Sequence, residues 1–285
     1  MILLTGANGR VGSSAAQHLA QRGLPFRVMV RHRDRLGMLA KLTDDICVAD
    51  FGDRASLSAA LNGIGCALLV TPNHELQSRW EANFIEVAAA CGVHHVVKIS
   101  SMEASATALG AIPRGHYAGE CRLRESGMGW TMLRPNFFCQ NLLMFARGIA
   151  EKNVFNLPFG SARVAPIDTR DVGAIAARVL SEDGHESKQY TLSGNPLVDF
   201  TEVAAALSSA LGRDIRYIAQ EPADFRAFLG RIVSSPWHVD AVCELFAQIA
   251  AGALEQLSDD AVDLLGRPTI SLSDFIEDHR EAFEP

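Results

Sequence analysis

The sequence predicts an α/β protein: a Rossmann doubly wound parallel sheet with helices on both faces, followed by a small, mainly helical C-terminal lobe. Three observations predict it. Short apolar runs alternate with helical patterns through the first half of the chain. A glycine-rich turn follows the first of these runs directly. After the last short apolar run, helical patterns predominate.

Strands are expected where short apolar runs stand between turn residues. These runs cover residues 2–4, 26–30, 46–48, 66–71, 96–100, 130–133, 189–192 and 215–218. Strands that alternate with helices in this rhythm form a parallel sheet. The first six runs therefore belong to one sheet that is covered on both faces.

Helices are expected between the strands, and several of them stop at a glycine. The segment after His74 shows the pattern most clearly, because its apolar residues recur at spacings of four, four, three and four and so share one helix face. These residues are Leu76, Trp80, Phe84, Val87 and Cys91. The other predicted helices cover residues 11–22, 56–61, 116–126, 200–211, 238–254 and a last segment from residue 273.

The 285 residues have room for one large domain with a small appendage. We expect residues 1–150 to form a Rossmann domain that binds NAD(P). Residues 151–285 are expected to form a smaller C-terminal lobe that binds the substrate and returns some strands to the main sheet.

Composition excludes several classes of partner. The formal net charge of −7 gives no electrostatic reason to bind nucleic acid or an anionic membrane. No stretch approaches the ~18 consecutive apolar residues of a membrane span, and no basic segment precedes the first apolar run. We therefore expect a cytoplasmic protein whose partner is a small molecule. Whether it forms a homodimer is left open.

The six cysteines contain no C-x-x-C pair, and several lie inside apolar runs. We interpret them as reduced side chains that serve as small hydrophobes. Because possible ligands do not cluster, no metal is expected. The pair His94-His95 precedes an apolar run and is interpreted as the end of a loop rather than as a metal ligand.

The first strand runs into Thr5-Gly6-Ala7-Asn8-Gly9-Arg10-Val11-Gly12, with glycines spaced G-x-x-G-x-x-G. Glycines there allow a tight turn, a close approach of the backbone to a pyrophosphate, and close packing of helix on strand. A glycine-rich turn without ligand is the alternative, but the strand before and the helix after favour nucleotide binding. The predicted contacts are Gly6, Asn8, Gly9, Arg10, Val11 and Gly12.

Arg31 follows the second strand directly, where NAD-binding proteins of this fold carry an acidic residue. A guanidinium suits the 2′-phosphate of NADP(H) through forked, charge-assisted hydrogen bonds. The sequence therefore predicts NADPH rather than NADH. Arg33 or Arg35 could share this role, whereas Asp34 lies too far into the loop to replace the acidic residue. A solvated basic loop is the alternative.

With these features the chain resembles the NmrA-like family of atypical short-chain dehydrogenases/reductases, nearly end to end, and in particular its quinone oxidoreductase-like and triphenylmethane reductase-like members. The resemblance depends on several segments in a fixed order. They are Thr5-Gly6-x-x-Gly9-x-x-Gly12, Val30-Arg31, Ala49-Asp50-Phe51, Leu69-Val70-Thr71-Pro72, Val97-Lys98-Ile99-Ser100-Ser101, Leu133-Arg134-Pro135-Asn136-Phe137-Phe138, Asp168-Thr169-Arg170-Asp171-Val172 and Tyr190-Thr191-Leu192-Ser193-Gly194.

The resemblance implies further positions around the cofactor. Asp50 and Phe51 would flank the adenine, and Thr71 with Pro72 would lie along the ribose and phosphates. It also places Ser100 at the end of the fifth strand, near the nicotinamide, with Asn136 and Phe137 following the sixth strand. These positions agree with the rule that ligands bind at the carboxyl ends of parallel strands. Ordinary core packing is the alternative for Phe137 and Phe138.

The Tyr-x-x-x-Lys pair of the wider superfamily is absent, and the chain reads His116-Tyr117-Ala118-Gly119-Glu120 in its place. His116 and Glu120 are four residues apart and share a helix face. We take His116, Tyr117 and Glu120 as the candidate catalytic residues, with His116 or Tyr117 as the proton donor. The alternative is a surface His–Glu pair in the first turn of a helix.

These features together predict an NADPH-dependent reductase of a small apolar or aromatic molecule with a carbonyl or conjugated group, quinone-like or biosynthetic. An apolar or aromatic substrate is expected because aromatic and sulfur-containing side chains are available to line its pocket. The candidates are Met102, Phe138, Met144, Phe145, Phe155 and Trp237.

Two other functions stay open at this point. The missing Tyr-Lys pair favours a redox sensor that binds NADP(H) and a protein partner without turnover, and the resemblance includes such regulators. The same fold also serves biosynthetic isomerases, dehydratases and cyclases, since a fold does not determine a function.

Overall fold

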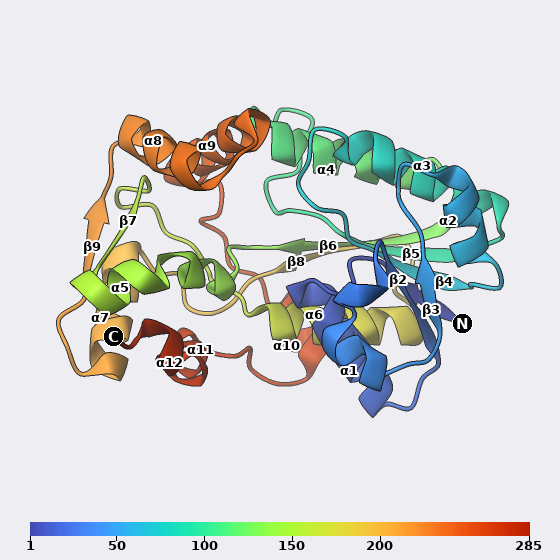
Figure 1. Cartoon of the computed structure of the whole chain (residues 1–285), viewed down its shortest axis with the longest axis horizontal. Helices are drawn as coiled ribbons and strands as arrows, with labels where there is room; N and C mark the ends of the chain where they lie inside the picture. The colour runs from blue at the N-terminus through green and yellow to red at the C-terminus, as the bar shows by residue number, and fades with distance from the viewer.

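The structure is a computed structural model that describes residues 1–285 except the side chain of Arg35. Its centre is a sheet of seven parallel strands in the order β3-β2-β1-β4-β5-β6-β8 (Figure 1). The strands are β1 (Ile2–Leu4), β2 (Phe26–Val30), β3 (Ile46–Val48), β4 (Cys66–Leu69), β5 (His95–Ile99), β6 (Gly129–Pro135) and β8 (Lys188–Leu192). The strand order reverses between β1 and β4, and ligands bind at such switch points of α/β sheets.

Helices cover both faces of this sheet, as the sequence predicts. α1, α6 and α10 lie on one face, and α2, α3 and α4 on the other (Figure 1). The helices are α1 (Arg10–Gln21), α2 (Arg54–Leu61), α3 (Gln77–Ala90), α4 (Ala111–Arg124), α5 (Ala146–Lys152), α6 (Thr169–Ser181), α7 (Phe200–Leu211), α8 (Pro222–Ile232), α9 (Pro236–Ala250), α10 (Asp260–Leu265), α11 (Leu272–Asp278) and α12 (Arg280–Phe283). Three short 3-10 helices are η1 (Arg33–Arg35), η2 (Gly37–Lys41) and η3 (Cys139–Phe145).

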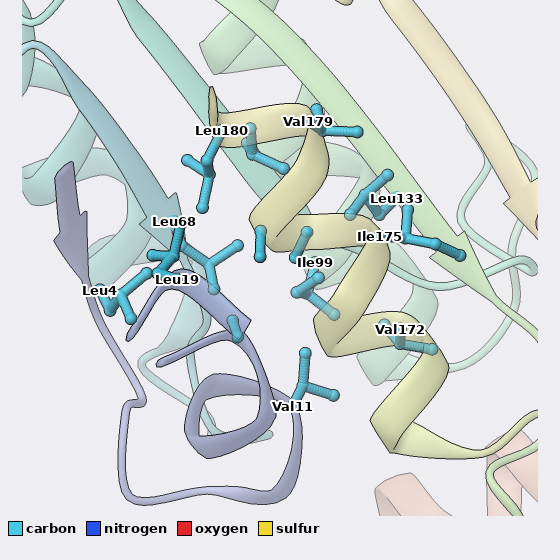
Figure 2. Close-up of a cluster of buried hydrophobic side chains, with 14 of the residues drawn as sticks. Leu4, Val11, Leu19, Leu68, Ile99, Leu133, Val172, Ile175, Val179 and Leu180 are labelled. Carbon is cyan, nitrogen blue, oxygen red and sulfur yellow. The ribbon is translucent and has the colours of Figure 1, made fainter. Parts of the chain in front are cut away.

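The central strands are buried on both faces because alternate residues enter two different cores. Leu4 and Leu68 pack with α1 and α6, whereas Leu3 and Leu69 pack with α2 and α3. Figure 2 shows the first of these cores, in which Val11 of α1 and Val172 of α6 approach the ends of the strands. Each fully buried aliphatic side chain contributes roughly 1.5–3 kcal/mol relative to exposure.

α1 and α6 are packed against each other unusually closely. A Cβ on Gly173 would lie 2.4 Å from the side chain of Ser14, so only glycine fits at that point of α6. The hydroxyl of Ser14 donates a hydrogen bond to the carbonyl oxygen of Arg170 at 3.0 Å. The helix that follows the glycine loop is therefore held in place by a helix from the second half of the chain.

The rest of the second half forms a lobe with its own core of aromatic residues, among them Phe155, Phe159 and Phe200. Its two-stranded parallel sheet pairs β7 (Val154–Leu157) with β9 (Arg216–Ala219), so the predicted strand near residue 215 lies here. By contrast, β8 and α6 belong to the main sheet and its cover. The division at residue 150 stays a prediction, since segments on both sides of it build the sheet. Among the described residues, no helix combines the length and apolar character needed to cross a bilayer.

Helix α4 begins earlier than the predicted 116–126. It starts at Ala111, and Pro113 lies in its first turn, where a proline's missing N–H costs no intrahelical bond. His116 consequently lies in the second turn of the helix rather than at its start. The side chains of His116 and Glu120 are buried, so the pair is not the surface pair that was the alternative.

Candidate functional site

The glycine loop connects β1 to α1 in a turn that only glycine permits at two positions. Gly6 has a φ of +57°, in the left-handed region, and a Cβ there would lie 2.9 Å from the Cβ of Val70. A Cβ on Gly12 would lie 2.3 Å from the carbonyl oxygen of Gly6. Gly9 is the N-cap of α1 and offers no side-chain cap, so the first-turn N–H groups face outward for an anion.

Two adjoining cavities follow the carboxyl ends of the strands and share the wall made by Gly6, Gly9, Val70, Thr71 and Pro72. The first cavity, of about 260 Å³, is completed by Asn8, Met29, Val30, Arg31, His32, Asp50, Phe51 and Trp80. The second, of about 420 Å³, extends over the ends of β5 and β6 and beneath α9. The walls of the second cavity include Arg10, Val11, Gly12, Ser100, His116, Asn136, Phe137 and Phe138. Every residue predicted to bind the cofactor thus lines one or both cavities.

The first cavity contains the arginine on which the predicted cofactor preference depends. Arg31 is exposed and lines the cavity at the end of β2. Arg33 instead donates a hydrogen bond from Nη2 to the carbonyl oxygen of Ile46 at 3.2 Å, toward β3. The side chain of Arg35, the third candidate, lies outside the described part of the structure. The geometry therefore favours Arg31 for a 2′-phosphate.

Trp80 is a residue of the first cavity that sequence reasoning missed. Its place in the apolar stripe of a helix suggested core packing only, yet Trp80 lines the same cavity as Phe51. The ring of Trp80 also stacks on His74 with centroids 4.4 Å apart. Trp80 and Phe51 together provide apolar ring surfaces for a flat heterocycle.

The second cavity has a polar floor and an apolar cover. Ser100 and Asn136 follow β5 and β6, while Leu245, Phe246 and Ile249 of α9 lie over them. Asn136 is held in place because its Nδ2 donates a hydrogen bond to the carbonyl oxygen of Leu254 at 3.0 Å. A cavity of this kind excludes water from a bound aromatic ring while keeping a few polar groups in contact with it.

The structure does not place all the residues predicted to line the substrate pocket in one cavity. Phe138 lines the second cavity, and Met102 lies beside it against Asn136, whose Nδ2 is 3.2 Å from the Met102 sulfur. Met144, Phe145 and Phe155 line a different cavity in the C-terminal lobe, because η3 and α5 carry the chain away from the strand ends. Trp237 begins α9, with its ring centroid 6.4 Å from that of His74. Substrate binding by these four residues stays a prediction, and the placement of the three in the lobe cavity does not favour it.

A fully buried polar cluster lies directly behind His116. Lys98 of β5 and Glu81 of α3 form an ion pair, with Nζ 2.6 Å from Oε1. The Lys98 Nζ also lies 3.3 Å from Nδ1 of His116. Gln77 Nε2 is 3.1 Å from Glu81 Oε1 and 3.2 Å from His116 Nδ1, and Thr71 donates to Glu81 Oε1 at 2.7 Å. Sequence reasoning missed Lys98, Glu81 and Gln77, since each stands in a segment that was interpreted as strand or helix packing.

The hydrogen bonds to His116 determine its protonation. An ammonium group has donors only, so the Nδ1 that faces Lys98 must accept, and the ring hydrogen resides on Nε2. Burial, together with the positive charges of Lys98 and Arg134, holds the pKa of His116 well below its ordinary value. His116 is therefore neutral at neutral pH and, as a residue of the second cavity, offers an N–H donor there.

Glu120 does not pair with His116 but belongs to a second buried cluster. It accepts hydrogen bonds from Ser100 Oγ at 2.7 Å, from Arg134 Nε at 2.8 Å and from Arg124 at 3.0 Å. Burial alone would raise the pKa of Glu120, but the hydrogen bonds from Arg134 and Ser100 outweigh it and lower the pKa. Glu120 thus fixes Ser100 and Arg134 at the end of β5 and β6. Its role as a catalytic group stays a prediction.

Tyr117 takes a different face of α4 from His116. Its hydroxyl interacts with Cys121, which raises the pKa of Tyr117, and the side chain is not among the described residues that line the second cavity. Its function as a proton donor stays a prediction. A second protonatable group does reach the second cavity: Glu103, whose pKa is raised by burial.

Replacing Glu120 with alanine should lower the free energy of unfolding by roughly 1.5–3 kcal/mol, because it removes a buried carboxylate and its charged hydrogen bonds to Arg134 and Arg124, whose side chains are partly exposed and can still reach water. The lowered pKa implies that Glu120 contributes its full stability above the ordinary carboxyl value of about 4.3. That contribution is lost as the pH falls through the lower value of the folded protein.

Urea unfolding at neutral and acidic pH measures both effects. Glu125→Ala, at the exposed end of the same helix, is the control and should cost less than about 0.5 kcal/mol. Equal costs for the two variants would refute the structural role assigned to Glu120.

Relatives of known name cover the whole chain. An NAD(P)H azoreductase from Xenophilus azovorans is 34% identical over 283 residues, which are 99% of each protein. A (4-alkanoyl-5-oxo-2,5-dihydrofuran-3-yl)methyl phosphate reductase from Streptomyces griseus is 36% identical over 292 residues, with 100% of both chains covered.

A solved structure matches the fold at similar coverage. The NADPH-dependent quinone oxidoreductase of Escherichia coli, in complex with NADPH, superposes with a TM-score of 0.89 at 29% identity over 98% of this chain and 99% of that one. The model of the NmrA-like family matches residues 1–264. The segments that suggested this resemblance form the glycine loop, the two cavities, the first turn of α6 and, for residues 190–194, the end of strand β8. The chain belongs to the NmrA-like family.

Proposed function

We propose that this protein is an NADPH-dependent reductase of small, flat, conjugated molecules such as quinones and azo compounds. The observation that carries this proposal is the pair of adjoining cavities, which runs along the switch point of the sheet from Arg31 at one end to His116 at the other. When bound, the nicotinamide supplies a hydride.

The residues along the cavities fit such a cofactor. A Cβ on Gly9 would meet only the carbonyl oxygen of Gly6, at 3.2 Å, so the open space beside Gly9 suits a pyrophosphate at the start of α1. Phe51 and Trp80 hold the adenine ring, and Arg31 binds the 2′-phosphate. Ser100 and Asn136 orient the nicotinamide, while the apolar residues of α9 exclude water from the reacting atoms.

His116 and the apolar cover define the substrate. The neutral imidazole presents its Nε2–H to a substrate oxygen or nitrogen that gains electron density during reduction. Phe138, Leu245 and Phe246 provide apolar surface for an aromatic ring. The named activities of the relatives, on azo compounds and quinones, support the same class of flat electron acceptor.

An assay of NADPH oxidation against a panel of quinones, azo dyes, enones and imines tests the proposal. Turnover of at least one quinone or azo compound, with recovery of the reduced product, is expected. Tight binding of NADPH without turnover of any acceptor would instead support the redox sensor, which the absent Tyr-Lys pair favours. Conversion of an acceptor without net oxidation of NADPH would support an isomerase or cyclase.

NADPH should bind more tightly than NADH, by roughly tenfold to a hundredfold, because a hydrogen bond to a charged group contributes ~1.5–3 kcal/mol. Arg31→Ala should narrow that difference, and rising salt should narrow it too because Arg31 is exposed. Calorimetric titration with both cofactors measures the effect, and Arg33→Ala is the matched control. Equal or tighter NADH binding by the unmodified protein at low salt would refute the role of Arg31.

The cellular compartment and the oligomeric state of this protein are also proposals. The six cysteines are free thiols in the structure, which suits a reducing compartment such as the cytoplasm. A homodimer is compatible with the fold and requires a measurement of mass in solution.

A further inference from the structure

We propose that Lys98 is a buried proton reservoir for His116, a positioning role that rests on the proposed reductase function. In this arrangement the Nε2–H of His116 is given to the substrate, and Lys98 replaces the lost proton through Nδ1. Lys98 touches neither cavity, so it acts only through the imidazole.

The position of the ion pair is the first argument. Lys98 and Glu81 are completely buried, and burying two charges costs several kcal/mol per ion before their attraction is counted. A buried ion pair is therefore weak evidence of a stabilising function. Lys98 of this pair is hydrogen-bonded to His116, which lines the second cavity. The pair therefore lies where it can supply a proton to that histidine.

The space made for the pair is the second argument. A Cβ on Gly119 would lie 1.7 Å from Oε2 of Glu81, so α4 carries a glycine where the carboxylate approaches it. Thr71, Gln77 and Lys98 all donate to Oε1, whereas the buried Oε2 has no hydrogen-bond partner among the described residues. The carboxylate is thus held on one side by three donors, which stabilise its negative charge when Lys98 gives up a proton.

The proton transfer balances without any further reagent. As the substrate gains a hydride, the N–H bond at Nε2 of His116 breaks and a new O–H or N–H bond forms on the substrate. The N–H bond at Nζ of Lys98 breaks at the same time, and a new one forms at Nδ1. His116 stays neutral throughout and changes tautomer, while Lys98 becomes a neutral amine beside the Glu81 carboxylate. After the product leaves, Nε2 takes up one proton from the solvent, supplied by hydronium or a buffer acid, and the Nδ1 proton returns to Lys98.

Such a reservoir explains how a histidine with a strongly lowered pKa can serve as an acid. Without such a partner, a buried neutral imidazole that donates its Nε2–H proton would become an imidazolate anion, and burial disfavours a charged form. The groups that face the ring are Lys98 from β5, Gln77 from α3 and Arg134 from β6, and the cavity also contains Glu103. Among the described groups that hydrogen-bond to Nδ1, only Lys98 can release a proton, since Gln77 is not acidic.

The decisive experiment compares two substrates that differ in their need for a proton. Reduction of a quinone takes up a hydride and a proton, whereas a cationic triarylmethyl dye becomes neutral on gaining a hydride alone. The variant is Glu81→Gln with Lys98→Met, which removes both charges together and keeps an acceptor for Thr71. We expect single-turnover quinone reduction to fall ~10²–10⁴-fold, the range of general acid catalysis, and dye reduction to change by less than about threefold.

A second variant and a second measurement keep the proposal testable if the double variant does not fold. Lys98→Arg retains the positive charge but cannot release a proton, so it should impair quinone reduction selectively as well. Nitrogen NMR of His116 in the cofactor-free protein should show the neutral Nε2–H tautomer at neutral pH. In the double variant the pKa of His116 should rise, because the charge of Lys98 is one of the causes that lower it.

The outcomes separate the reservoir from the proposed function. If the wild-type protein reduces neither of these substrates nor any azo compound, the proposed reductase is wrong and the reservoir falls with it. If it reduces both, but the variants slow both equally, the reductase stands and Lys98 is merely structural. An Nδ1–H tautomer in the wild-type protein would overturn the reservoir whatever the activities are.

Discussion

Gly9→Val is expected to abolish NADPH binding while leaving the protein folded. Gly9 has an ordinary extended backbone and lines both cavities, so a larger side chain there projects into the space for the pyrophosphate and requires only a small shift of the Gly6 carbonyl oxygen, 3.2 Å from the added Cβ. The valine would separate the phosphates from the N–H groups at the start of α1. Losing two hydrogen bonds to a charged group, each worth ~1.5–3 kcal/mol, weakens binding by more than about a hundredfold.

Calorimetric titration of NADPH, together with thermal unfolding, checks this result. Gly23→Ala is the matched control: Gly23 ends α1 with a φ of +67° and open space around it, so its replacement strains the backbone far from both cavities. The control should lose some stability and keep its affinity. Unchanged affinity in a folded Gly9→Val protein would refute the assignment of the glycine loop. Gly12→Ala is not a useful substitute, since its Cβ would collide with the backbone of Gly6.

His116→Ala is expected to lower kcat for a quinone by ~10²–10⁴-fold, with the affinity for NADPH nearly unchanged. The imidazole is the N–H donor that the second cavity offers beside Ser100, and alanine leaves no group in its place. Stopped-flow measurement of hydride transfer at saturating NADPH separates this step from product release.

Tyr117→Phe distinguishes the two candidate proton donors. Because Tyr117 lies on another face of α4, close to Cys121, we expect the larger loss in His116→Ala. A large loss in Tyr117→Phe with full activity in His116→Ala would assign the proton to the tyrosine. Full activity of both variants would show that α4 is structural and that the proton comes from elsewhere, with Glu103 as the next candidate.

The binding half of the site was predictable because its determinants are local. A strand, a G-x-x-G-x-x-G turn and a helix follow one another between Ile2 and Gln21, and Arg31 comes directly after the next strand. In parallel sheets these segments meet at one edge whatever the rest of the chain does. Four elements begin and end at the predicted residues, namely β1, β2, β3 and α7.

The chemistry behind His116 was not predictable, because it depends on which faces of three separate elements meet. The spacing of His116 and Glu120 predicted a shared helix face, and both side chains are indeed buried on α4. Yet four residues of helix separate them by a full turn, so one meets Lys98 and the other meets Arg134. Nothing in the local sequence of β5 distinguishes Lys98 from a lysine at the edge of a sheet.

Helix α6 was missed for a different reason. Its buried residues lie on one face, opposite Arg170, Ala174 and Arg178 at spacings of four, so the pattern of a helix that covers a sheet was present in the sequence but was not used. A second local indication was Asp168, whose carboxylate caps the helix by accepting from the Arg170 N–H. The segment had been noted as part of the family resemblance, without a structural meaning.

The packing of α1 on α6 has a consequence for the living cell. The hydroxyl of Ser14 bonds to a carbonyl 156 positions further along the chain, so the nucleotide-binding helix cannot settle until more than half of the protein has been synthesised. At the usual ~5–20 residues per second, the glycine loop waits roughly ten seconds or more on the ribosome for its partner. During that interval the apolar face of α1 is uncovered, and chaperones can bind it. Cofactor can be captured only after the segment that forms α6 has been made.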